Sequence, residues 1–303
     1  MNNSLSIIRL DAVSAIIEAR GADTDAFLQG QLSNDIRALA PDRAQLSSYN
    51  SAKGRMLAVL TLSRRDGGID IELPRGLIEP VARRLRMFVL RSKLTLTPSA
   101  DAMLGLVGDG AADALAQAGL AVPMAPLDVV EADGLRIQRR LGVLPRYSLS
   151  GGAALIDALA ARWAAHAADA AAWTLAQVRA GEPVVLPETQ DHFVAQMANL
   201  DLLGGISFDK GCYTGQEIVA RLHYLGQLKR RMFLCEGLGL PPEPGSDVHV
   251  QGQDQAVGEV VQSAADGNGG FAASVVLQLS QAEAEALRVG DTALGRPRTY
   301  AAA

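Results

Sequence analysis

Residues 204–221 read GGISFDKGCYTGQEIVAR and hold the densest signal in the chain. Thr214, followed three residues later by Glu217, predicts a capping box at the start of a helix. Tyr213 packing against Ile218 would complete that helix start as a hydrophobic staple. The other residues around the cap add nothing to it, and they are Lys210, Gly211, Cys212 and Gln216. We therefore expect the residues just before the helix to have a functional role.

Cys212 is the residue of this stretch best suited to chemistry. It lies just before the predicted helix start at Thr214 and two residues after Lys210, and a helix N-terminus and a nearby cation both favour thiolate over thiol. We expect the pKa of its thiol to lie below the free value of roughly 8.5. Gly211 and Gly215 leave room for a partner to approach the sulfur. Cys212, with Lys210 beside it, is the candidate catalytic pair.

The other cysteine and the histidines give weaker signals. Cys235 follows an apolar run at residues 232–234 and is expected to be an inert core residue. His223 lies eleven residues after Cys212, near enough to join it as a base or weak metal ligand, but the spacing matches no standard zinc pattern. We predict no metal site. No G-x-S-x-G, P-loop, H-E-x-x-H or dinucleotide fingerprint is present, so hydride transfer and nucleotide hydrolysis lack support.

Composition sets the class of protein. The 303 residues are 49% hydrophobic and 20% charged, enough apolar surface to fold into about two domains. The net charge of −5 and an aromatic content of 4% argue against direct nucleic-acid binding. No window approaches the roughly 18 apolar residues of a spanning helix, so we expect a cytoplasmic protein with no membrane partner.

One basic cluster stands out from this acidic background. It lies on and just after a predicted helix, and its members are Arg75, Arg83, Arg84, Arg86, Arg91 and Lys93. Such a run is more often a solvated helix face than a nucleic-acid footprint, given the charge of the whole chain. We interpret it as a solvated face.

Hydrophobic periodicity predicts an α+β chain. A helix opens at Asp23 or Thr24 and carries apolar residues to Ile36, and a second has its apolar face between Leu77 and Val89. The Ala-rich stretch 151–180 holds one or two helices and closes at Gly181. The predicted strands of the first two thirds are 6–10, 12–19, 45–50, 56–63, 69–73, 93–97 and 104–107. Residues 228–303 have short strands and Gly-rich turns, which predicts a small β-barrel or sandwich.

Several motifs together resemble the YgfZ family, folate-binding proteins related to the T-protein of the glycine cleavage system. Residues 210–217, KGCYTGQE, resemble the family's K-G-C-Y-x-G-Q-E signature, and Arg221 follows it. Residues 27–35 resemble its F-L-Q-G-Q-x-x-x-D, and residues 52–56 its A-K-G-[KR]-M turn. Residues 199–201 and 204–208, which precede the cysteine, also fit the family's sequence. The resemblance therefore covers nearly the whole chain, and it assigns motif roles to Gly211, Tyr213, Gly215, Gln216, Glu217 and Arg221.

The resemblance implies a fold and a function. It implies a ring of three subdomains around a central hole that can hold tetrahydrofolate. Residues 1–227 would form two intertwined α+β subdomains, and residues 228–303 the C-terminal β-barrel. Family members assist the assembly or repair of iron–sulfur enzymes, including those that thiomethylate tRNA. The implied partners are therefore iron–sulfur enzymes or assembly proteins, and tRNA modification would be an indirect result.

Two departures from the related sequences bear on activity. Residues 173–181 resemble W-x-x-x-x-I-E-A-G, in which the tryptophan and the acid lie near folate; Trp173 is kept, but Arg179 replaces the acid. Trp173 is thus a folate contact or a packing residue. The acid pair of the T-protein turn is replaced by Ala58 and Val59, which cannot steer charge at a folate, so aminomethyltransferase activity is not expected. The alternative function is a folate-dependent one-carbon transferase or demethylase with another catalytic set.

Overall fold

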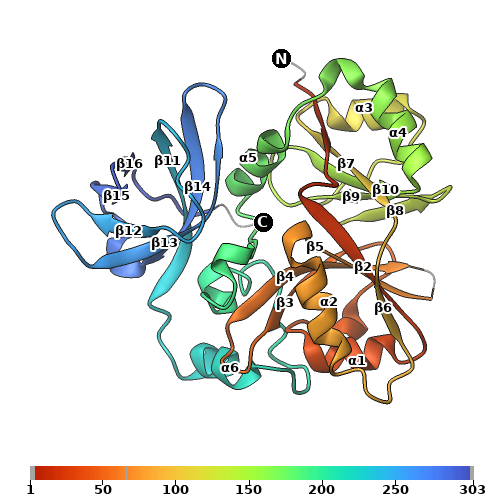
Figure 1. Cartoon of the computed structure of the whole chain (residues 1–303), viewed down its shortest axis with the longest axis horizontal. Coiled ribbons are helices and arrows are strands. Elements are labelled where there is room, and N and C mark those ends of the chain that lie inside the picture. The colour runs from red at the N-terminus through yellow and green to blue at the C-terminus, as the bar shows by residue number, and fades with distance from the viewer. Residues whose placement is uncertain (1–3, 66, 301–303) are drawn as a thin grey trace.

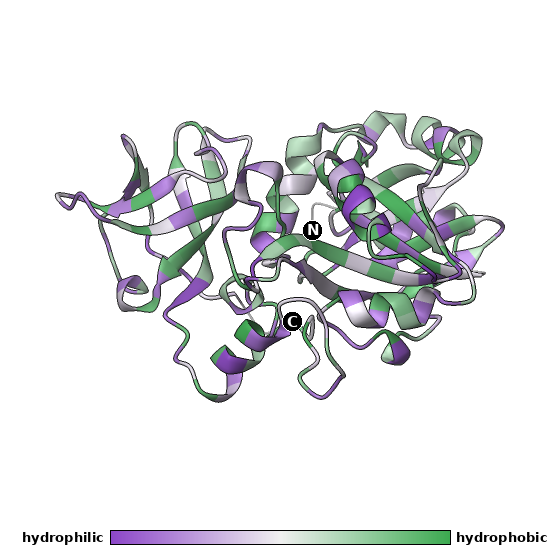
Figure 2. Cartoon of the chain, turned by 60° about the horizontal axis from the view of Figure 1, so that its bottom comes forward, coloured by the Kyte–Doolittle hydropathy of each residue, from purple (hydrophilic) through white to green (hydrophobic). Residues whose placement is uncertain are grey.

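The structure is a computed structural model, and it describes residues 4–65 and 67–300. Within these residues the chain forms three sheets with antiparallel strand pairing, joined by helices (Figure 1). The hydrophobic residues gather along the strands, and the connecting loops are mostly hydrophilic (Figure 2). The α+β fold class predicted from the sequence is confirmed at this level.

The first sheet has the strand order β3-β4-β5-β2-β6 and contacts two helices. Its elements are β2 (Ser14–Arg20), α1 (Thr24–Gln31), β3 (Gln45–Asn50), β4 (Met56–Arg65), β5 (Gly68–Pro74), α2 (Ile78–Arg86) and β6 (Thr95–Pro98). Helix α2 buries Ile78, Val81 and Leu85, which recur at helical spacing, and leaves its polar face outside. The largest core cluster of the described chain lies between this sheet and its helices.

The second sheet has the strand order β1-β7-β10-β9-β8 and takes its first strand from the start of the chain. Its elements are β1 (Ser6–Arg9), β7 (Ala102–Val107), α3 (Ala111–Gln117), β8 (Val129–Ala132), β9 (Leu135–Arg139), β10 (Arg146–Gly151), α4 (Ala153–Arg162) and α5 (Ala170–Ala180). Helices α3 and α4 bury one face, and α5 packs Trp173 and Ala176 on the other. Gly181 ends α5 with φ of 67°, as predicted from the sequence.

The third sheet is a curled half-barrel at the C-terminus, with strand order β11-β14-β13-β12-β15-β16 (Figure 1). After helix α6 (Gln216–Tyr224), its strands are β11 (Arg230–Leu238), β12 (Asp247–Val250), β13 (Ala256–Ala265), β14 (Gly270–Gln278), β15 (Leu287–Val289) and β16 (Thr292–Leu294). Its curl brings Gly295 to β11, where the Gly295 N–H donates to the Glu236 carbonyl at 2.6 Å. The predicted C-terminal barrel is thus a half-barrel, and the ring of three subdomains stays a prediction.

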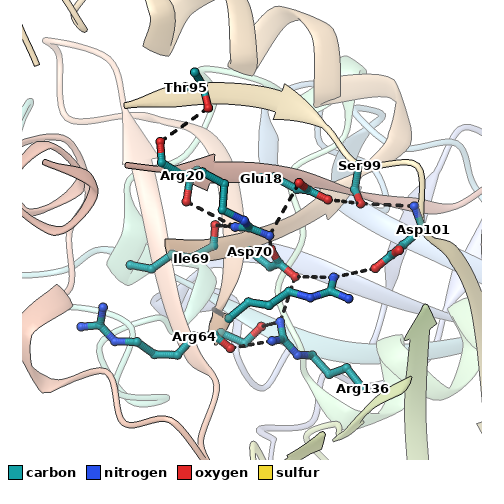
Figure 3. Close-up of polar contacts among 12 residues, drawn as sticks. Glu18, Arg20, Arg64, Ile69, Asp70, Thr95, Ser99, Asp101 and Arg136 are labelled. Carbon is teal, nitrogen blue, oxygen red and sulfur yellow. Dashed lines mark hydrogen bonds and ion pairs between the residues drawn. The ribbon is translucent and has the colours of Figure 1, made fainter. Parts of the chain in front are cut away.

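A buried polar cluster joins the first two sheets. The Asp70 carboxylate on β5 is 2% exposed and binds Arg20 on β2 and Arg65 on β4 (Figure 3). It also accepts a hydrogen bond at 2.9 Å from Arg136, which comes from β9 of the other sheet and also donates to Ser63 at 2.8 Å. The ion pair between Asp70 and Arg136 is costly to break, because removal of one partner would leave the other as a buried charge with less compensation. The cluster therefore fixes one sheet against the other.

Two helix predictions are wrong at their C-terminal ends. Helix α1 ends at Gln31, not Ile36, because the next side chains bind backbone groups elsewhere and draw the chain out of the helix. The Ser33 hydroxyl donates to the Gly205 carbonyl at 2.8 Å, and the Asn34 amide donates to the Leu46 carbonyl at 2.7 Å. Helix α2 ends at Arg86, which leaves Phe88, inside the apolar face predicted between residues 77 and 89, 42% exposed.

Candidate functional site

The three motifs of the sequence meet in one place, and Lys210 joins two of them. Lys210 is 8% exposed, and its Nζ donates to the carbonyls of Gln29 and Leu32 at 2.7 Å and of Asn34 at 2.8 Å. These acceptors lie where α1 ends, where carbonyls have no partner inside the helix. An ammonium has three donors, so all of them are used. The residue before the cysteine loop is thereby fastened to the end of α1.

This geometry gives Lys210 a structural role, and its predicted catalytic role beside Cys212 stays a prediction. Its three N–H groups are directed at backbone carbonyls of residues 29–34. Burial lowers the pKa of Lys210 to about 8, and the nearby Asp35 carboxylate opposes that shift. The ammonium form therefore still dominates at neutral pH. Lys210 is a positioning residue that holds the loop.

The turn at residues 51–55 packs against the start of α6 through two glycines. A Cβ on Gly215 would lie 2.5 Å from the Ser51 carbonyl oxygen, and a Cβ on Gly54 would lie 2.6 Å from the Ile218 Cβ. Both glycines have positive φ, 79° and 70°. Only glycine allows this approach without strain. The A-K-G-R-M turn and the cysteine motif are thus in backbone contact.

The predicted capping box at Thr214 and Glu217 is wrong. Helix α6 begins at Gln216, and Gly215 is its N-cap in the left-handed conformation, with no side-chain cap bond. At Gly215 the chain is in close contact with the 51–55 turn, and the N-cap lies one residue later than predicted. The staple geometry predicted for Tyr213 no longer applies, and its ring, 7% exposed, packs under Lys210 with Nζ 5.2 Å from its centroid.

Cys212 is exposed between two buried anchors. It follows buried Lys210 by two residues and precedes buried Tyr213, while Gly211 beside it is also exposed. Cys235 differs: it lies on β11 with 0% exposure, and burial raises the pKa of its thiol to about 12. The prediction of an inert Cys235 agrees with this burial. The fold presents one thiol to solvent and encloses the other.

The remaining motif residues lie on or beside α6. Glu217 and Arg221 are exposed and Gln216 is partly buried, and the helix is anchored where the Gln196 amide donates to the Val219 carbonyl at 2.7 Å. His223 stacks on Phe208 with ring centroids 3.7 Å apart. Within residues 4–65 and 67–300, no hydrogen bond joins His223 to Cys212, and no three potential ligands gather into a metal site.

The sequence reasoning missed Ser33 and Asn34, which hold the other side of the loop. The Asn34 amide donates to the Gly204 carbonyl at 2.7 Å, and the Ser33 carbonyl accepts from the Ser207 N–H at 3.0 Å. Both residues are buried. Both residues fall inside the 27–35 motif, which could have marked them as candidates. Their side-chain partners at Gly204 and Gly205 lie about 170 residues away, so the sequence did not indicate these contacts.

A second candidate region lies where the three sheets meet. This central cavity is about 50 Å³ and is lined by Val59, Thr61, Glu72, Arg140, Gln177, Glu182 and Gln262, among others. Trp173 lies close by but is only 2% exposed. The Arg146 guanidinium sits 4.7 Å from its ring centroid, and a Cβ on Gly105 would come within 2.7 Å of the ring. Trp173 is thus packed between α5 and the second sheet, and a folate contact at this residue stays a prediction.

The cavity does not fit a pterin. Its volume is far below that of ligand pockets, which span roughly 300–1,000 Å³. Its charged groups bind one another: Glu182 pairs with Arg140 and Arg146, and Glu72 accepts from Arg140 at 2.9 Å. Burial opposes ionisation of Glu182, but the two arginines outweigh it and hold its pKa at about 2. Arg179, at the position of the missing acid, pairs with Glu236 at the surface.

The fold defines the class of protein. A solved structure of the glycine cleavage system aminomethyltransferase T from Bartonella henselae superposes with a TM-score of 0.78 and covers 98% of this chain and 85% of that one, at 16% identity. This likeness shows a GcvT-like fold. No protein-family model matches the chain.

The curated relatives are more specific. The tRNA-modifying protein YgfZ of Yersinia pseudotuberculosis serotype O:1b is 33% identical over 299 residues, 96% of this chain and 90% of the relative. The tRNA-modifying protein YgfZ of Pectobacterium carotovorum subsp. carotovorum is 34% identical over 237 residues, 76% of this chain and 71% of the relative. The chain belongs to the YgfZ family. In the part of the chain that the structure describes, no helix is long and apolar enough to cross a membrane.

Proposed function

We propose that this protein is an accessory protein for the assembly or repair of iron–sulfur enzymes, that it supports tRNA modification through them, and that Cys212 is its working group. The observation that carries the proposal is an exposed thiol on a loop held by two separate segments of the chain, residues 29–34 and 51–55. A thiolate is both a nucleophile and a soft metal ligand, which suits contact with a cluster or its sulfur. The partners are iron–sulfur enzymes or their assembly proteins.

The construction of the loop supports a role beyond scaffolding. Burying a lysine and aligning three carbonyls on it is costly unless every donor and acceptor is satisfied. The adjoining residues Gly211 and Cys212 make no such contribution and face solvent. A loop held this firmly keeps the sulfur in a fixed position while leaving it accessible, which is what transfer to or from another protein requires.

The alternative, a folate-dependent one-carbon transferase or demethylase, is disfavoured by the central cavity. The side chains at the positions of the T-protein acids are apolar: Ala58 is 0% exposed and Val59 is 5% exposed. The cavity next to Val59 is about 50 Å³ and its carboxylates are already paired with arginines. The proposal therefore assigns no chemical step to tetrahydrofolate, the ligand that the resemblance to the YgfZ family implies.

The test is complementation of a bacterial strain that lacks its own family member. The readouts are the activity of an iron–sulfur enzyme and the level of thiomethylated tRNA, with protein levels checked by immunoblot. Wild type and the control Cys235→Ser should restore both, and Cys212→Ser should restore neither while remaining folded. Full rescue by Cys212→Ser would overturn the proposal.

A further inference from the structure

A second pocket lies between α2 and the first sheet, away from the residues assigned above. It has a volume of about 270 Å³, close to the lower end of ligand pockets at roughly 300 Å³. In Figure 1, α2 crosses the sheet near β3 and β4, which supply the pocket's floor. Its lining is Tyr49, Leu57, Pro80, Val81, Arg83, Arg84, Met87 and Gln190.

The charge of this lining is positive and unbalanced. Arg83 and Arg84 both line the pocket, and the lining contains no carboxylate. Among the described residues neither guanidinium makes a salt bridge, whereas Arg86 on the same helix pairs with Glu79 at 3.7 Å. Two unpaired cations around one concave surface favour an anion, because the low-dielectric wall strengthens their field.

Hydrogen-bond donors also converge on the pocket. The Nε of Arg84 is buried and has no partner in the described chain, although buried guanidinium donors are normally satisfied. Tyr49, which also lines the pocket, is 1% exposed; burial raises the pKa of its phenol, and the Arg84 cation opposes the rise. The Gln190 amide is fixed nearby, because it donates to the Leu57 carbonyl at 2.9 Å.

The rest of the pocket is apolar. Leu57, Pro80, Val81 and Met87 line it as well; Val81 is buried, and Met87 is 59% exposed. An occupant must therefore carry a compact oxyanion at one end and a small apolar or flat group at the other. Inorganic phosphate alone would leave the apolar wall in water, and a neutral hydrocarbon would leave the arginines unpaired.

We infer that this pocket binds a small organic anion, a phosphate or carboxylate on a compact apolar body, held by Arg83 and Arg84. A bidentate arginine contact with such an oxyanion would supply the acceptor that Arg84 lacks. This explains part of the basic cluster that the sequence suggested was a solvated face. The inference stands independently of the role proposed for Cys212.

The test is isothermal titration of the full-length protein with four probes: phenyl phosphate, benzoate, inorganic phosphate and benzyl alcohol. We expect phenyl phosphate or benzoate to bind at least tenfold more tightly than either inorganic phosphate or benzyl alcohol. The better of the two identifies the oxyanion. Arg84→Met and Arg83→Met should each weaken that binding about tenfold, a loss of about 1.4 kcal/mol.

Arg91→Met is the matched control, because Arg91 belongs to the same basic cluster but does not line the pocket. It should bind the probes as wild type does. Arg83→Met removes an exposed side chain and should not affect folding, so the test holds even if Arg84→Met is unstable. Equal binding by wild type and Arg83→Met, equal binding of benzyl alcohol and the two organic anions, or no heat at 10 mM of any probe would each overturn the inference.

Discussion

The Cys212 loop and the central cavity use buried charge in opposite ways. At the loop, a single buried cation binds neutral carbonyls from another segment, and the neighbouring thiol stays open to solvent. In the cavity, Glu72, Glu182, Arg140 and Arg146 bind one another and leave only about 50 Å³. The loop thus exposes the Cys212 thiol to solvent, whereas the charged groups of the central cavity are already paired with one another. This difference places the proposed function at the loop.

The largest effect is expected from breaking the cavity cluster. Glu182→Gln removes the carboxylate shared by Arg140 and Arg146, which leaves buried Arg146 without a carboxylate partner and Arg140 with Glu72 alone. Loss of one partner from such a cluster costs about 3–5 kcal/mol, and urea denaturation would measure it. The control Glu236→Gln removes an exposed partner of Arg298 and should cost less than about 1 kcal/mol. Similar losses in the two variants would show that the cavity cluster is not structurally important.

The same carboxylate should control stability in acid. The pKa of Glu182 is about 2 in the folded state against an ordinary value of 4.5, so the unfolded chain takes up the proton first as the pH falls. The stabilisation is present above about pH 4.5 and is lost toward pH 2, on the order of 3 kcal/mol in total. The difference in unfolding free energy between wild type and Glu182→Gln should shrink across this window. A difference that stays constant from pH 6 to pH 3 would contradict this assignment.

A smaller loss is expected where the loop is fastened. Lys210→Met leaves the carbonyls of Gln29, Leu32 and Asn34 without their donor, at a cost of about 2 kcal/mol. Hydrogen exchange should speed up at residues 29–34 and 211–215 before other regions. Lys229→Met, an exposed lysine after α6, serves as the control and should change neither property. Unchanged exchange in Lys210→Met would show that the lysine does not hold the loop.

Sequence patterns predicted the elements better than the contacts between them. The strand at 45–50 and the positive-φ cap at Gly181 follow from local chemistry and are confirmed. The helix start at Thr214 could not be predicted correctly, because Gly215 is in close contact with a turn more than 150 residues away. The role of Lys210 was missed for the same reason: its proximity to Cys212 in sequence does not indicate where its long side chain ends.

The smallest effect is expected at Gly211 and Gly215, the two glycines on either side of Cys212 in the loop. Gly215→Ala forces an alanine into positive φ against the Ser51 carbonyl and should cost about 1–2 kcal/mol. It should also change the rate at which iodoacetamide labels Cys212. Gly211→Ala points into open space and should stay within about 0.5 kcal/mol of wild type. If the two variants behave alike, the turn at 51–55 does not position the loop.

One complementation experiment tests most directly whether the function lies at the Cys212 loop or at the central cavity. It measures how well one variant of each region restores iron–sulfur enzyme activity. Val59→Leu adds a methylene toward the central cavity and closes part of its 50 Å³, while Cys212→Ser alters only the exposed loop. Thermal unfolding of both proteins verifies that they are folded. We predict that Val59→Leu restores activity as wild type does and that Cys212→Ser does not. Rescue by Cys212→Ser together with failure of Val59→Leu would contradict the proposal and move the function to the cavity.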